Sequence, residues 1–327
     1  DPRTIYSAVI DPGKASSYRA SYYFVGALLA KFGTVTIGYP GGDNFLSRPI
    51  DQHIKALTAL GARFQWHSDH YVVQAGELIG AEIYFDTVTS GATVNSMLAA
   101  VRAKGTTILR NAARDPEVVD TAVFLNGLGA KITGAGTDSI RIEGVPYLGG
   151  GEHSVIPDRI VAGAFLMAAG MTGGRITVTD VLPDHLESCL AKLKEVGLHV
   201  ECGEQSMTVC ASGHLRPTRI RTAMYPGFAT DLQQPMTALL TQASGKSIVT
   251  DPVFPHRTNH VAQLKRMGAD VEIRKDGIIV KGGRPLRGSI VQASDIRAGT
   301  CLMLAGLAAE GTTVITGGEH IERGYRS

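Results

Sequence analysis

The chain has 327 residues, of which 44% are apolar and 19% are charged, and its formal net charge is +2. This composition is typical of a soluble globular protein of one or two domains. The small net charge gives no general argument for binding nucleic acid or a membrane, so we expect small-molecule partners and only a local anion site. No apolar run reaches 18 residues and no signal peptide is recognisable, which predicts a cytoplasmic protein.

A helix-ending phrase recurs along the chain about every seventy residues. Its glycines, spaced 68, 68 and 71 residues apart, are Gly61, Gly129, Gly197 and Gly268. A second phrase, a glycine followed by a strand-like triplet, recurs half a period away at Gly33, Gly105, Gly174, Gly245 and Gly311. A fixed period indicates one supersecondary unit used several times. Because seventy residues is too long for the common solenoid repeats, we expect each copy to be a small α/β subdomain.

Two kinds of helix are expected within each period. The first kind is apolar nearly all round, which predicts burial on every side, at residues 21–30, 92–103, 160–171, 236–243 and 298–309. The second kind is amphipathic, with an apolar stripe that is clearest in residues 186–196 and recurs in residues 54–60 and 261–267. Each amphipathic helix runs into a glycine of the helix-ending phrase, where the left-handed conformation costs little.

Strands are expected after both kinds of helix. Those after the apolar helices are residues 35–37, 107–109, 176–178 and 314–316; those after the amphipathic helices are residues 63–66, 131–133 and 270–273, with hairpin partners such as residues 207–210 and 277–280. The unit is therefore predicted to be β-α-β-α-β-β, in an α/β fold with strands outside and apolar helices inside. The run Gly149-Gly150-Gly151 marks the candidate boundary between two lobes, residues 1–155 and 156–327.

Polar residues gather where the apolar helices begin. Ser16, Thr89 and Thr230 fit N-caps, whose side chains accept hydrogen bonds from free N–H groups of the first turn. Arginine is unexpected at such a position, because a cation opposes the helix dipole. Three arginines nevertheless stand near these starts: Arg19, Arg159 and Arg297. They predict a site shared with an anion, which both the dipole and the guanidinium groups favour.

Two turn-rich loops add candidates. In residues 39–49, Asp43 fits a turn former after two glycines as well as a functional residue. In residues 253–260, His256 and His260 have a spacing that metal ligands use, but no third ligand is evident, so we expect no metal and a cap or core role for His260. The four cysteines are expected to be reduced thiols, the alternative being a pair of Cys202 with Cys210 across a hairpin.

Several phrases occur in a fixed order over essentially the whole chain. They are Pro40-Gly41-Gly42, Arg48-Pro49-Ile50-Asp51-Gln52-His53, Ser90-Gly91-Ala92-Thr93, residues 111–117, Ile156-Pro157-Asp158-Arg159, residues 226–233, Asp295-Ile296-Arg297 and Arg323-Gly324-Tyr325. Together they resemble the enolpyruvyl transferases, and the first two resemble the branch that uses a UDP-sugar. The resemblance implies an inside-out α/β barrel with two lobes of three repeats each.

The resemblance also implies a reaction. The enolpyruvyl group of phosphoenolpyruvate would pass to the 3-hydroxyl of UDP-N-acetylglucosamine (UDP-GlcNAc) by addition and elimination with phosphate release, the first committed step of peptidoglycan synthesis, and no cofactor is implied. Asp231 matches the aspartate beside that hydroxyl and is the expected general base. Asp43 stands where many members carry a cysteine that acts as general acid, and a protonated carboxyl with a raised pKa can do the same work. Fosfomycin alkylates that cysteine, so we expect this chain to resist it.

Substrate-binding residues follow from the same matching. Arg48 and Arg323 are expected to hold the phosphate of phosphoenolpyruvate, and Arg257 and Arg297 its carboxylate, because bidentate guanidinium geometry suits both groups. The UDP-GlcNAc site is expected to be lined by Arg19, Arg48, Pro49, Ile50, Asp51, Gln52, His53, Thr87, Val88, Thr89, Ser90, Gly91, Asp231 and Val253. Thr87 stands where some members have a lysine, which predicts a weaker diphosphate contact.

One family phrase is absent. Members carry Gly-Ala-Lys-Asn near the N-terminus, where the lysine contacts phosphoenolpyruvate, and nothing before Arg19 matches it, since Lys14 belongs to a different phrase. Roughly one repeat is expected ahead of Asp1 and a short piece after Ser327, so the lobe of residues 1–155 would lack its first repeat and this fragment alone is expected to be inactive.

Two other functions stay open. The sister enzyme, 3-phosphoshikimate 1-carboxyvinyltransferase, shares the fold and the chemistry, but the Pro-Gly-Gly loop and the run from Arg48 to His53 favour the UDP-sugar branch. A catalytically inactive paralogue that binds UDP-GlcNAc or a protein partner would fit the missing lysine phrase and Asp43. The sequence gives no indication of oligomeric state.

Overall fold

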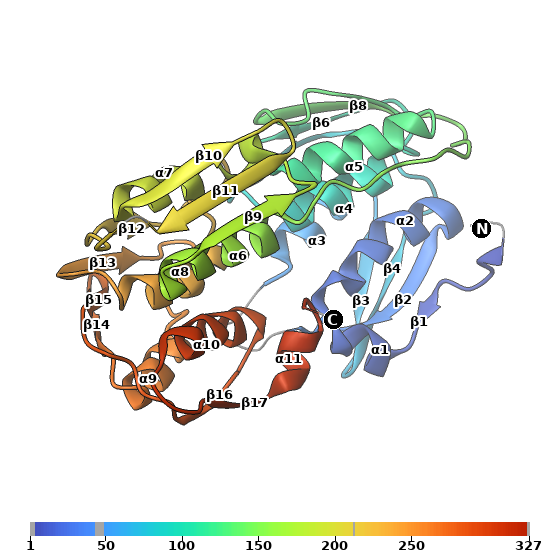
Figure 1. Cartoon of the computed structure of the whole chain (residues 1–327). Coiled ribbons are helices and arrows are strands. Elements are labelled where there is room, and N and C mark those ends of the chain that lie inside the picture. The colour runs from blue at the N-terminus through green and yellow to red at the C-terminus, as the bar shows by residue number, and fades with distance from the viewer. Residues whose placement is uncertain (1–3, 43–48, 212, 326–327) are drawn as a thin grey trace. The chain divides into compact units, whose positions relative to one another are not determined.

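The computed structural model describes residues 4–42, 49–211 and 213–325. The chain forms two compact units, Asp1–Ile156 and Pro157–Ser327. Both units are mixed α/β structures built from repeated elements (Figure 1). Asp43 and Arg48, two of the predicted site residues, lie outside the described residues.

The first unit contains two copies of the repeat. The first copy comprises β1 (Val9–Ile10), α1 (Pro12–Ser17), the 3₁₀ turn η2 (Arg19–Tyr22), α2 (Tyr23–Phe32), β2 (Thr34–Gly38), α3 (Asp51–Ala59), β3 (Arg63–Trp66) and β4 (His70–Gln74). The second copy comprises β5 (Glu82–Tyr84), α4 (Ser90–Ala100), β6 (Thr106–Arg110), α5 (Pro116–Gly127), β7 (Lys131–Thr133) and β8 (Ser139–Glu143).

The second unit contains three further sets of elements. The first set comprises α6 (Arg159–Thr172), β9 (Arg175–Thr179), η3 (Pro183–Leu186), α7 (Glu187–Val196), β10 (Leu198–Cys202) and β11 (Ser206–Ala211). The second comprises β12 (Arg219–Arg221), η4 (Thr230–Leu232), α8 (Gln233–Leu240), β13 (Lys246–Thr250), α9 (Asn259–Arg266), β14 (Asp270–Arg274) and β15 (Gly277–Lys281). The third comprises β16 (Ile290–Gln292), α10 (Ile296–Ala308), β17 (Val314–Thr316) and α11 (Gly318–Glu322).

Sheet topology confirms the predicted β-α-β-α-β-β unit. Three sheets have the same strand order, β1-β2-β4-β3, β5-β6-β8-β7 and β12-β13-β15-β14. In each, the first two strands pair in parallel across an apolar helix, and the other pairs are antiparallel. The sheet β10-β11-β9 has the antiparallel part of this pattern, and β16-β17 has the parallel pair.

Glycines with positive φ end the amphipathic helices, as predicted. The angles are 101° at Gly61, 98° at Gly129, 103° at Gly197 and 88° at Gly268. An L-residue is strained in this region, because its Cβ approaches the following carbonyl, whereas glycine has no Cβ. In the second phrase a strand follows Gly174 as predicted, β9 at Arg175–Thr179, and the left-handed residue that ends α6 is the preceding Gly173, with φ of 67°.

The apolar helices form the core of each unit. In the second unit α6, α8 and α10 contact one another, and in the first unit α2 contacts α4 (Figure 1). Burial on every side is not complete, because Phe24, Phe165 and Leu307 are 45%, 50% and 59% exposed. Helix α8 begins three residues before its predicted start. Its first turn is buried but polar, with Gln233 and Gln234 only 1% and 0% exposed, so an apolar pattern misses it.

A glycine lets the two core helices of the first unit approach closely. A Cβ on Gly26 of α2 would lie 2.3 Å from the backbone oxygen of Asn95 in α4. The Asn95 side chain uses this proximity, since its Oδ1 accepts a hydrogen bond of 2.8 Å from the Gly26 N–H. Its amide nitrogen lies 3.1 Å from Nδ1 of His53 in α3. One buried asparagine therefore connects three helices.

Two further sequence expectations concern cysteines and membranes. The register of β10 and β11 places Cys202 opposite Met207 and Cys210 opposite His199, so the alternative of a pair across this hairpin is wrong. All four cysteines are free thiols. In the part of the chain that the structure describes, no helix has the length and apolar character needed to cross a bilayer.

Candidate active site

Three predicted residues of the second unit meet in one charge cluster, which we call the Asp231 clasp. Asp231 lies in η4, and its Oδ1 accepts a hydrogen bond of 2.7 Å from Nη1 of Arg257. Its Oδ2 accepts a hydrogen bond of 3.1 Å from Nε of Arg297, and Nη2 of Arg297 lies 3.0 Å from the same oxygen in an ion pair. Two nitrogens of Arg297 therefore contact one oxygen of the carboxylate, and Nη1 of Arg257 contacts the other.

The clasp lies in a partly buried, positively charged environment. The side chain of Asp231 is 36% exposed, while those of Arg257 and Arg297 are only 4% and 13% exposed. Burial by itself would raise the pKa of Asp231, but the charges of Arg297 and Arg257 hold it well below its usual range. Asp231 is therefore ionised at neutral pH, and two guanidinium groups share one carboxylate. Within the clasp itself the formal charges of two guanidinium groups and one carboxylate sum to about +1, which suits a second anion.

A second aspartate fixes the loop that carries Arg257. The carboxylate of Asp251 accepts hydrogen bonds from Thr230 Oγ1 at 2.7 Å and from the N–H groups of Val253 and Phe254 at 3.1 Å and 2.9 Å. Thr230 in turn accepts from Nη1 of Arg257 at 3.2 Å. The prediction of Thr230 as an N-cap is wrong, because its hydroxyl is used by this loop and η4 has no side-chain cap.

The polar residues at the other helix starts differ in whether they cap the helix. Thr89 caps α4, as predicted, by accepting from the Ala92 N–H at 3.4 Å. Ser16 does not cap, because it lies inside α1 and its hydroxyl donates to the carbonyl of Gly13. Asp295 caps α10 by accepting from the N–H groups of Arg297 and Ala298 at 2.9 Å and 3.0 Å. This cap holds Arg297 in the first turn of the helix.

Arg323 also lies near the first turn of α10. It follows α11, which contacts α10, and it is exposed. The next residue, Gly324, lies so close to Ile296 that a Cβ there would be 2.3 Å from Ile296 Cδ1. The backbone of Arg323 therefore runs beside the turn that carries Arg297. The predicted residues Asp231, Val253, Arg257, Arg297 and Arg323 all belong to this region of the second unit.

In the first unit, predicted residues meet around Tyr22. Nη2 of Arg19 donates to the carbonyl of Pro49 at 3.4 Å, and its guanidinium lies 5.4 Å from the centre of the Tyr22 ring. The ring of Tyr22 meets His53 edge to face, with centroids 4.4 Å apart. A Cβ on Gly91 would lie 2.5 Å from the Tyr22 hydroxyl oxygen and 3.2 Å from Nε2 of His53. A side chain larger than that of glycine at position 91 would therefore have to displace the Tyr22 hydroxyl.

His53 is neutral at physiological pH. It is 7% exposed, and burial, together with the nearby charge of Arg19, lowers its pKa to about 4. Since Asn95 occupies its Nδ1 and Gly91 leaves room beside its Nε2, the second nitrogen is the one that faces the start of α4. A neutral imidazole there offers one hydrogen bond to a ligand without adding charge.

The other predicted residues of the first unit surround the same helix starts. Gln52 is 7% exposed and binds Asp86: its Oε1 accepts from the Asp86 N–H at 2.9 Å, and its Nε2 donates to the Asp86 carboxylate at 3.2 Å and to that of Asp51 at 2.8 Å. Because Gln52 of α3 holds Asp86, the next two residues, Thr87 and Val88, lie beside α3, and Thr87 is exposed. Ser90 donates to Asp115 at 2.8 Å. Ile50 precedes α3 and is half-buried.

His260 is a core residue, as one of the two sequence interpretations expected. It is 0% exposed, and neither ring nitrogen has a hydrogen-bond partner among the described residues. Burial lowers its pKa to about 3. In residues 4–42, 49–211 and 213–325, no group of three or more His, Cys, Asp or Glu side chains is arranged to hold a metal ion.

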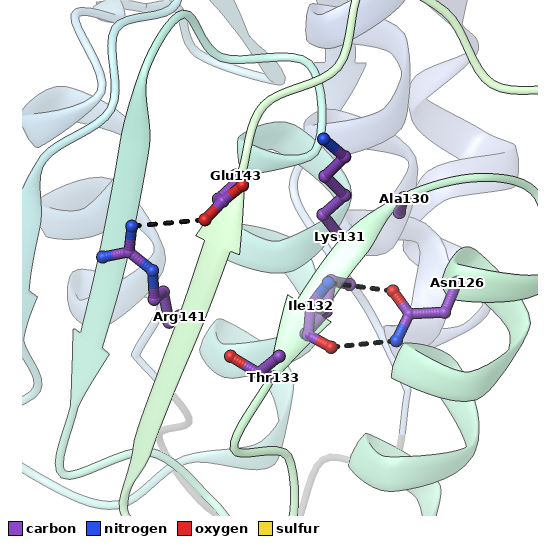
Figure 2. A pocket seen from close by; sticks show the side chains of 7 residues that line it. All are labelled: Asn126, Ala130, Lys131, Ile132, Thr133, Arg141 and Glu143. Atoms are coloured by element: carbon purple, nitrogen blue, oxygen red, sulfur yellow. Dashed lines mark hydrogen bonds and ion pairs between the residues drawn. The ribbon is translucent and has the colours of Figure 1, made fainter.

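Two of the pockets on the described surface differ in their relation to the predicted site. The larger, of about 300 Å³, lies in the first unit where α5 ends beside β7 and β8, and Figure 2 shows Asn126 bound to both backbone groups of Ile132 there, at 2.8 Å and 2.9 Å. It contains none of the predicted site residues. The smaller, of about 190 Å³, lies in the second unit, and its lining includes Gln233, Asp251 and Arg257, so it adjoins the clasp.

The chain is similar over nearly its whole length to known proteins. A family model described as EPSP synthase (3-phosphoshikimate 1-carboxyvinyltransferase) matches residues 4–327. UDP-N-acetylglucosamine 1-carboxyvinyltransferase 2 of Geobacillus kaustophilus (strain HTA426) is 51% identical over 99% of this chain and 76% of that protein. The protein of the same name in Bacillus subtilis (strain 168) is 49% identical over 100% of this chain and 76% of its own length.

Solved structures share the fold. The enolpyruvyl transferase NikO from Streptomyces tendae superposes with a TM-score of 0.86 and 25% identity, over 98% of this chain and 77% of that one. EPSP synthase from Acinetobacter baumannii superposes with a TM-score of 0.69 and 20% identity, over 94% of this chain and 74% of that one, which shows the fold alone. The fold is that of the enolpyruvyl transferases, as the sequence predicted. More particularly, the chain belongs to the EPSP synthase family.

Proposed function

We propose that this protein transfers the enolpyruvyl group of phosphoenolpyruvate to the 3-hydroxyl of UDP-GlcNAc and releases phosphate. One observation carries the choice of reaction: relatives about half identical over nearly the whole chain are named UDP-N-acetylglucosamine 1-carboxyvinyltransferase 2. The same observation disfavours the sister reaction on shikimate 3-phosphate. The reaction belongs to the first committed step of peptidoglycan synthesis, and both substrates are metabolites of the cytoplasm.

The clasp supports two roles in this reaction. Asp231 would take the proton of the sugar hydroxyl as its oxygen forms a bond to C2 of phosphoenolpyruvate. Arg257 and Arg297 would bind the carboxylate of phosphoenolpyruvate, because they already hold a carboxylate between them, with one arginine at each of its oxygens. In the unliganded protein that carboxylate is Asp231 itself. The substrate carboxylate and Asp231 therefore compete for the same two guanidinium groups.

This competition has a chemical consequence. While both arginines contact Asp231, its lowered pKa makes it a weak base. When a substrate carboxylate takes over part of the arginine contacts, the pKa of Asp231 rises towards its ordinary value and Asp231 becomes a better proton acceptor. Binding of phosphoenolpyruvate would thus prepare the base for its step.

The remaining roles fall on residues near the clasp and in the first unit. Arg48 and Arg323 would hold the phosphate, and Asp43 would protonate the methylene carbon before phosphate leaves. Arg19, the segment from Pro49 to His53, and the segment from Thr87 to Gly91 would bind UDP-GlcNAc. Their support is the cluster around Tyr22, in which Arg19, Pro49, His53 and Gly91 lie in contact.

An assay of phosphate release tests the proposal. The full-length protein, with any residues that precede Asp1 or follow Ser327, is purified and given phosphoenolpyruvate with UDP-GlcNAc or with shikimate 3-phosphate, and we expect release only with UDP-GlcNAc. Release only with shikimate 3-phosphate would identify the sister reaction. Binding of UDP-GlcNAc without phosphate release would identify an inactive paralogue.

Fosfomycin gives an independent test of Asp43. A carboxyl in place of the reactive thiol offers no sulfur to alkylate, so we expect turnover to continue in its presence and the intact mass to stay unchanged. Asp43→Cys is the matched variant and should gain both sensitivity and an adduct. A covalent adduct at Asp43 in the mass spectrum would contradict the assignment.

A further inference from the structure

The repeats share a polar contact, made by a residue at a fixed distance before each helix-ending glycine. Nine residues before each of these glycines, near the start of the amphipathic helix, stand Gln52, Asp120, Ser188 and Asn259. Each binds the segment that leads into the next apolar helix: Gln52 binds Asp86, Asp120 binds His153, Ser188 binds the carbonyl of Gly227, and Asn259 binds Ser294 and Asp295. One position of the repeat therefore connects successive copies.

At Asn259 this contact belongs to a longer, partly buried chain of hydrogen bonds. Nε2 of Gln234, in α8, donates to Oδ1 of Asn259 at 2.8 Å. Nδ2 of Asn259, at the start of α9, donates to Oδ2 of Asp295. Oδ1 of Asp295 accepts from the N–H groups of Arg297 and Ala298 at the start of α10. Gln234 and Asp295, at the two ends of this chain, are both 0% exposed, and Asn259 between them is half-buried.

Asn259 is the central link of this chain. A fully buried carboxylate is costly unless its oxygens are hydrogen-bonded, and Asn259 supplies a donor to the oxygen of Asp295 that the helix N–H groups do not reach. Ser294 Oγ, at 3.2 Å, is the other donor to that oxygen. Without Asn259, Asp295 is under-satisfied, and the first turn of α10, which carries Arg297, loses part of its cap.

Asn259 also stands two residues after Arg257 in the chain. Its two side-chain contacts, to α8 and to the start of α10, fix the end of the loop that presents Arg257. A single side chain therefore constrains both arginines of the clasp without touching Asp231. Misplacement of a binding group by about 1 Å can cost a large factor in affinity or rate.

We propose that Asn259 is a positioning residue of the anion site: it holds Arg257 and Arg297 at the separation at which both contact one carboxylate. The inference rests on the proposed function, in which that carboxylate belongs to phosphoenolpyruvate. The carboxylate does not change during the reaction, so its binding contributes equally to the ground and transition states. A loss of such binding raises KM and leaves kcat nearly unchanged.

Asn259→Leu tests the proposal, because leucine has a similar volume and makes no hydrogen bond. We expect KM for phosphoenolpyruvate to rise about tenfold, with kcat within about threefold of the unaltered protein and KM for UDP-GlcNAc unchanged. Asn259→Ser keeps a donor for Asp295 and should raise KM less; it also serves if the leucine variant does not fold. Calorimetry with phosphoenolpyruvate alone should show the same order of affinities.

Asp120→Leu is the matched control. It removes the equivalent contact in another repeat, to His153, and leaves the chain from Gln234 to Asp295 intact. It should lower thermal stability without changing KM for phosphoenolpyruvate. The proposal is overturned if Asp120→Leu raises KM for phosphoenolpyruvate as much as Asn259→Leu does. It is also overturned if Asn259→Leu raises KM for both substrates in parallel, or if Asn259→Leu leaves the binding of phosphoenolpyruvate unchanged. A parent protein that binds phosphoenolpyruvate but releases no phosphate refutes the proposed function instead, and calorimetry then still decides the role of Asn259.

Discussion

His53 and His260 occupy the same position in two repeats, each eight residues before a helix-ending glycine, Gly61 or Gly268. Both are buried, at 7% and 0% exposure, and burial lowers their pKa values to about 4 and about 3. Their surroundings differ, because Asn95 binds His53 whereas His260 has no hydrogen-bond partner among the described residues. The fold uses this position as a core site in one unit and as part of the Tyr22 cluster in the other.

The burial of His260 predicts a pH dependence of stability. Its folded-state pKa of about 3 lies below the value of about 6.5 in an unfolded chain. Between these values the unfolded state binds more protons, so the free energy of unfolding falls as pH falls below about 6.5, by up to about 1.4 kcal/mol per pH unit. His260→Phe removes this contribution. Urea unfolding between pH 7 and 4.5 should show the variant gaining about 2–3 kcal/mol relative to the unaltered protein.

The matched control for this experiment is His214→Phe, since His214 is exposed. It should leave the slope of stability against pH unchanged. A change of ring size shifts the free energy of unfolding equally at every pH, so the slope and not the absolute value carries the test. Equal slopes for His260→Phe and the unaltered protein would show that His260 takes up its proton in the folded state.

Removing the charge of Asp231 should have opposite effects on binding and on turnover. Asp231→Asn leaves Arg257 and Arg297 without their competing carboxylate, so the affinity for phosphoenolpyruvate should rise, by about tenfold if one charged hydrogen bond is gained. Turnover should fall by about 10²–10⁴-fold, because the general base is gone. Calorimetry and phosphate release measure the two effects separately.

Asp184→Asn serves as the control, because it removes the same charge from an exposed residue of η3 that does not line the pocket beside the clasp. Neither affinity nor turnover should change. If Asp231→Asn weakened binding of phosphoenolpyruvate, Asp231 would be helping to position the substrate and the competition proposed above would be wrong.

Gly91 should resist substitution because of its neighbours and not because of its φ angle. A Cβ there would lie 2.5 Å from the Tyr22 hydroxyl oxygen and 3.2 Å from Nε2 of His53, so Gly91→Ala must displace both rings. We expect a loss of about 1–3 kcal/mol in the free energy of unfolding and weaker binding of UDP-GlcNAc. Gly76→Ala is the control, since a Cβ at Gly76 meets no atom within 4 Å. Unchanged affinity for UDP-GlcNAc in Gly91→Ala would remove the Tyr22 cluster from the proposed site.

Much of the fold could be predicted because its main signals are local. A glycine at the end of an amphipathic stripe, as at Gly197, reports a left-handed residue whatever the tertiary structure. The alternation of amphipathic and apolar helices, with the strands between them, then defines the repeated unit. Repetition of that unit defines the strand order of the sheets. The start of α8 was misplaced because Gln233 and Gln234 are buried polar residues, and only neighbouring elements satisfy such residues.

The site was harder to predict than the fold. Matching to a family placed Asp231, Arg257 and Arg297 in one active site, but their mutual ion pairs join residues up to 66 positions apart and have no local signal. The role of Asn259 was missed for the same reason. A signal existed: the residue nine positions before each helix-ending glycine is polar in all four repeats. Thr230 shows the opposite error, a local signal that was misleading. Its residue type suits an N-cap, but its hydroxyl donates a hydrogen bond to Asp251, 21 positions along the chain.

Gly127 and Gly129, two positions apart, allow the effect of backbone conformation on stability to be measured where steric crowding plays no part. Gly127 and Gly129 both stand where a Cβ would meet no atom within 4 Å, but only Gly129 has a positive φ, of 98°. Gly127 is the last residue of α5, so Gly127→Ala should stabilise the protein by up to about 1 kcal/mol through helix propensity. Gly129→Ala should destabilise it by about 1–2 kcal/mol, because alanine is strained in the left-handed region. Urea unfolding measures both variants, and shifts of the same sign would mean that the helix-ending glycines are not selected for their backbone conformation.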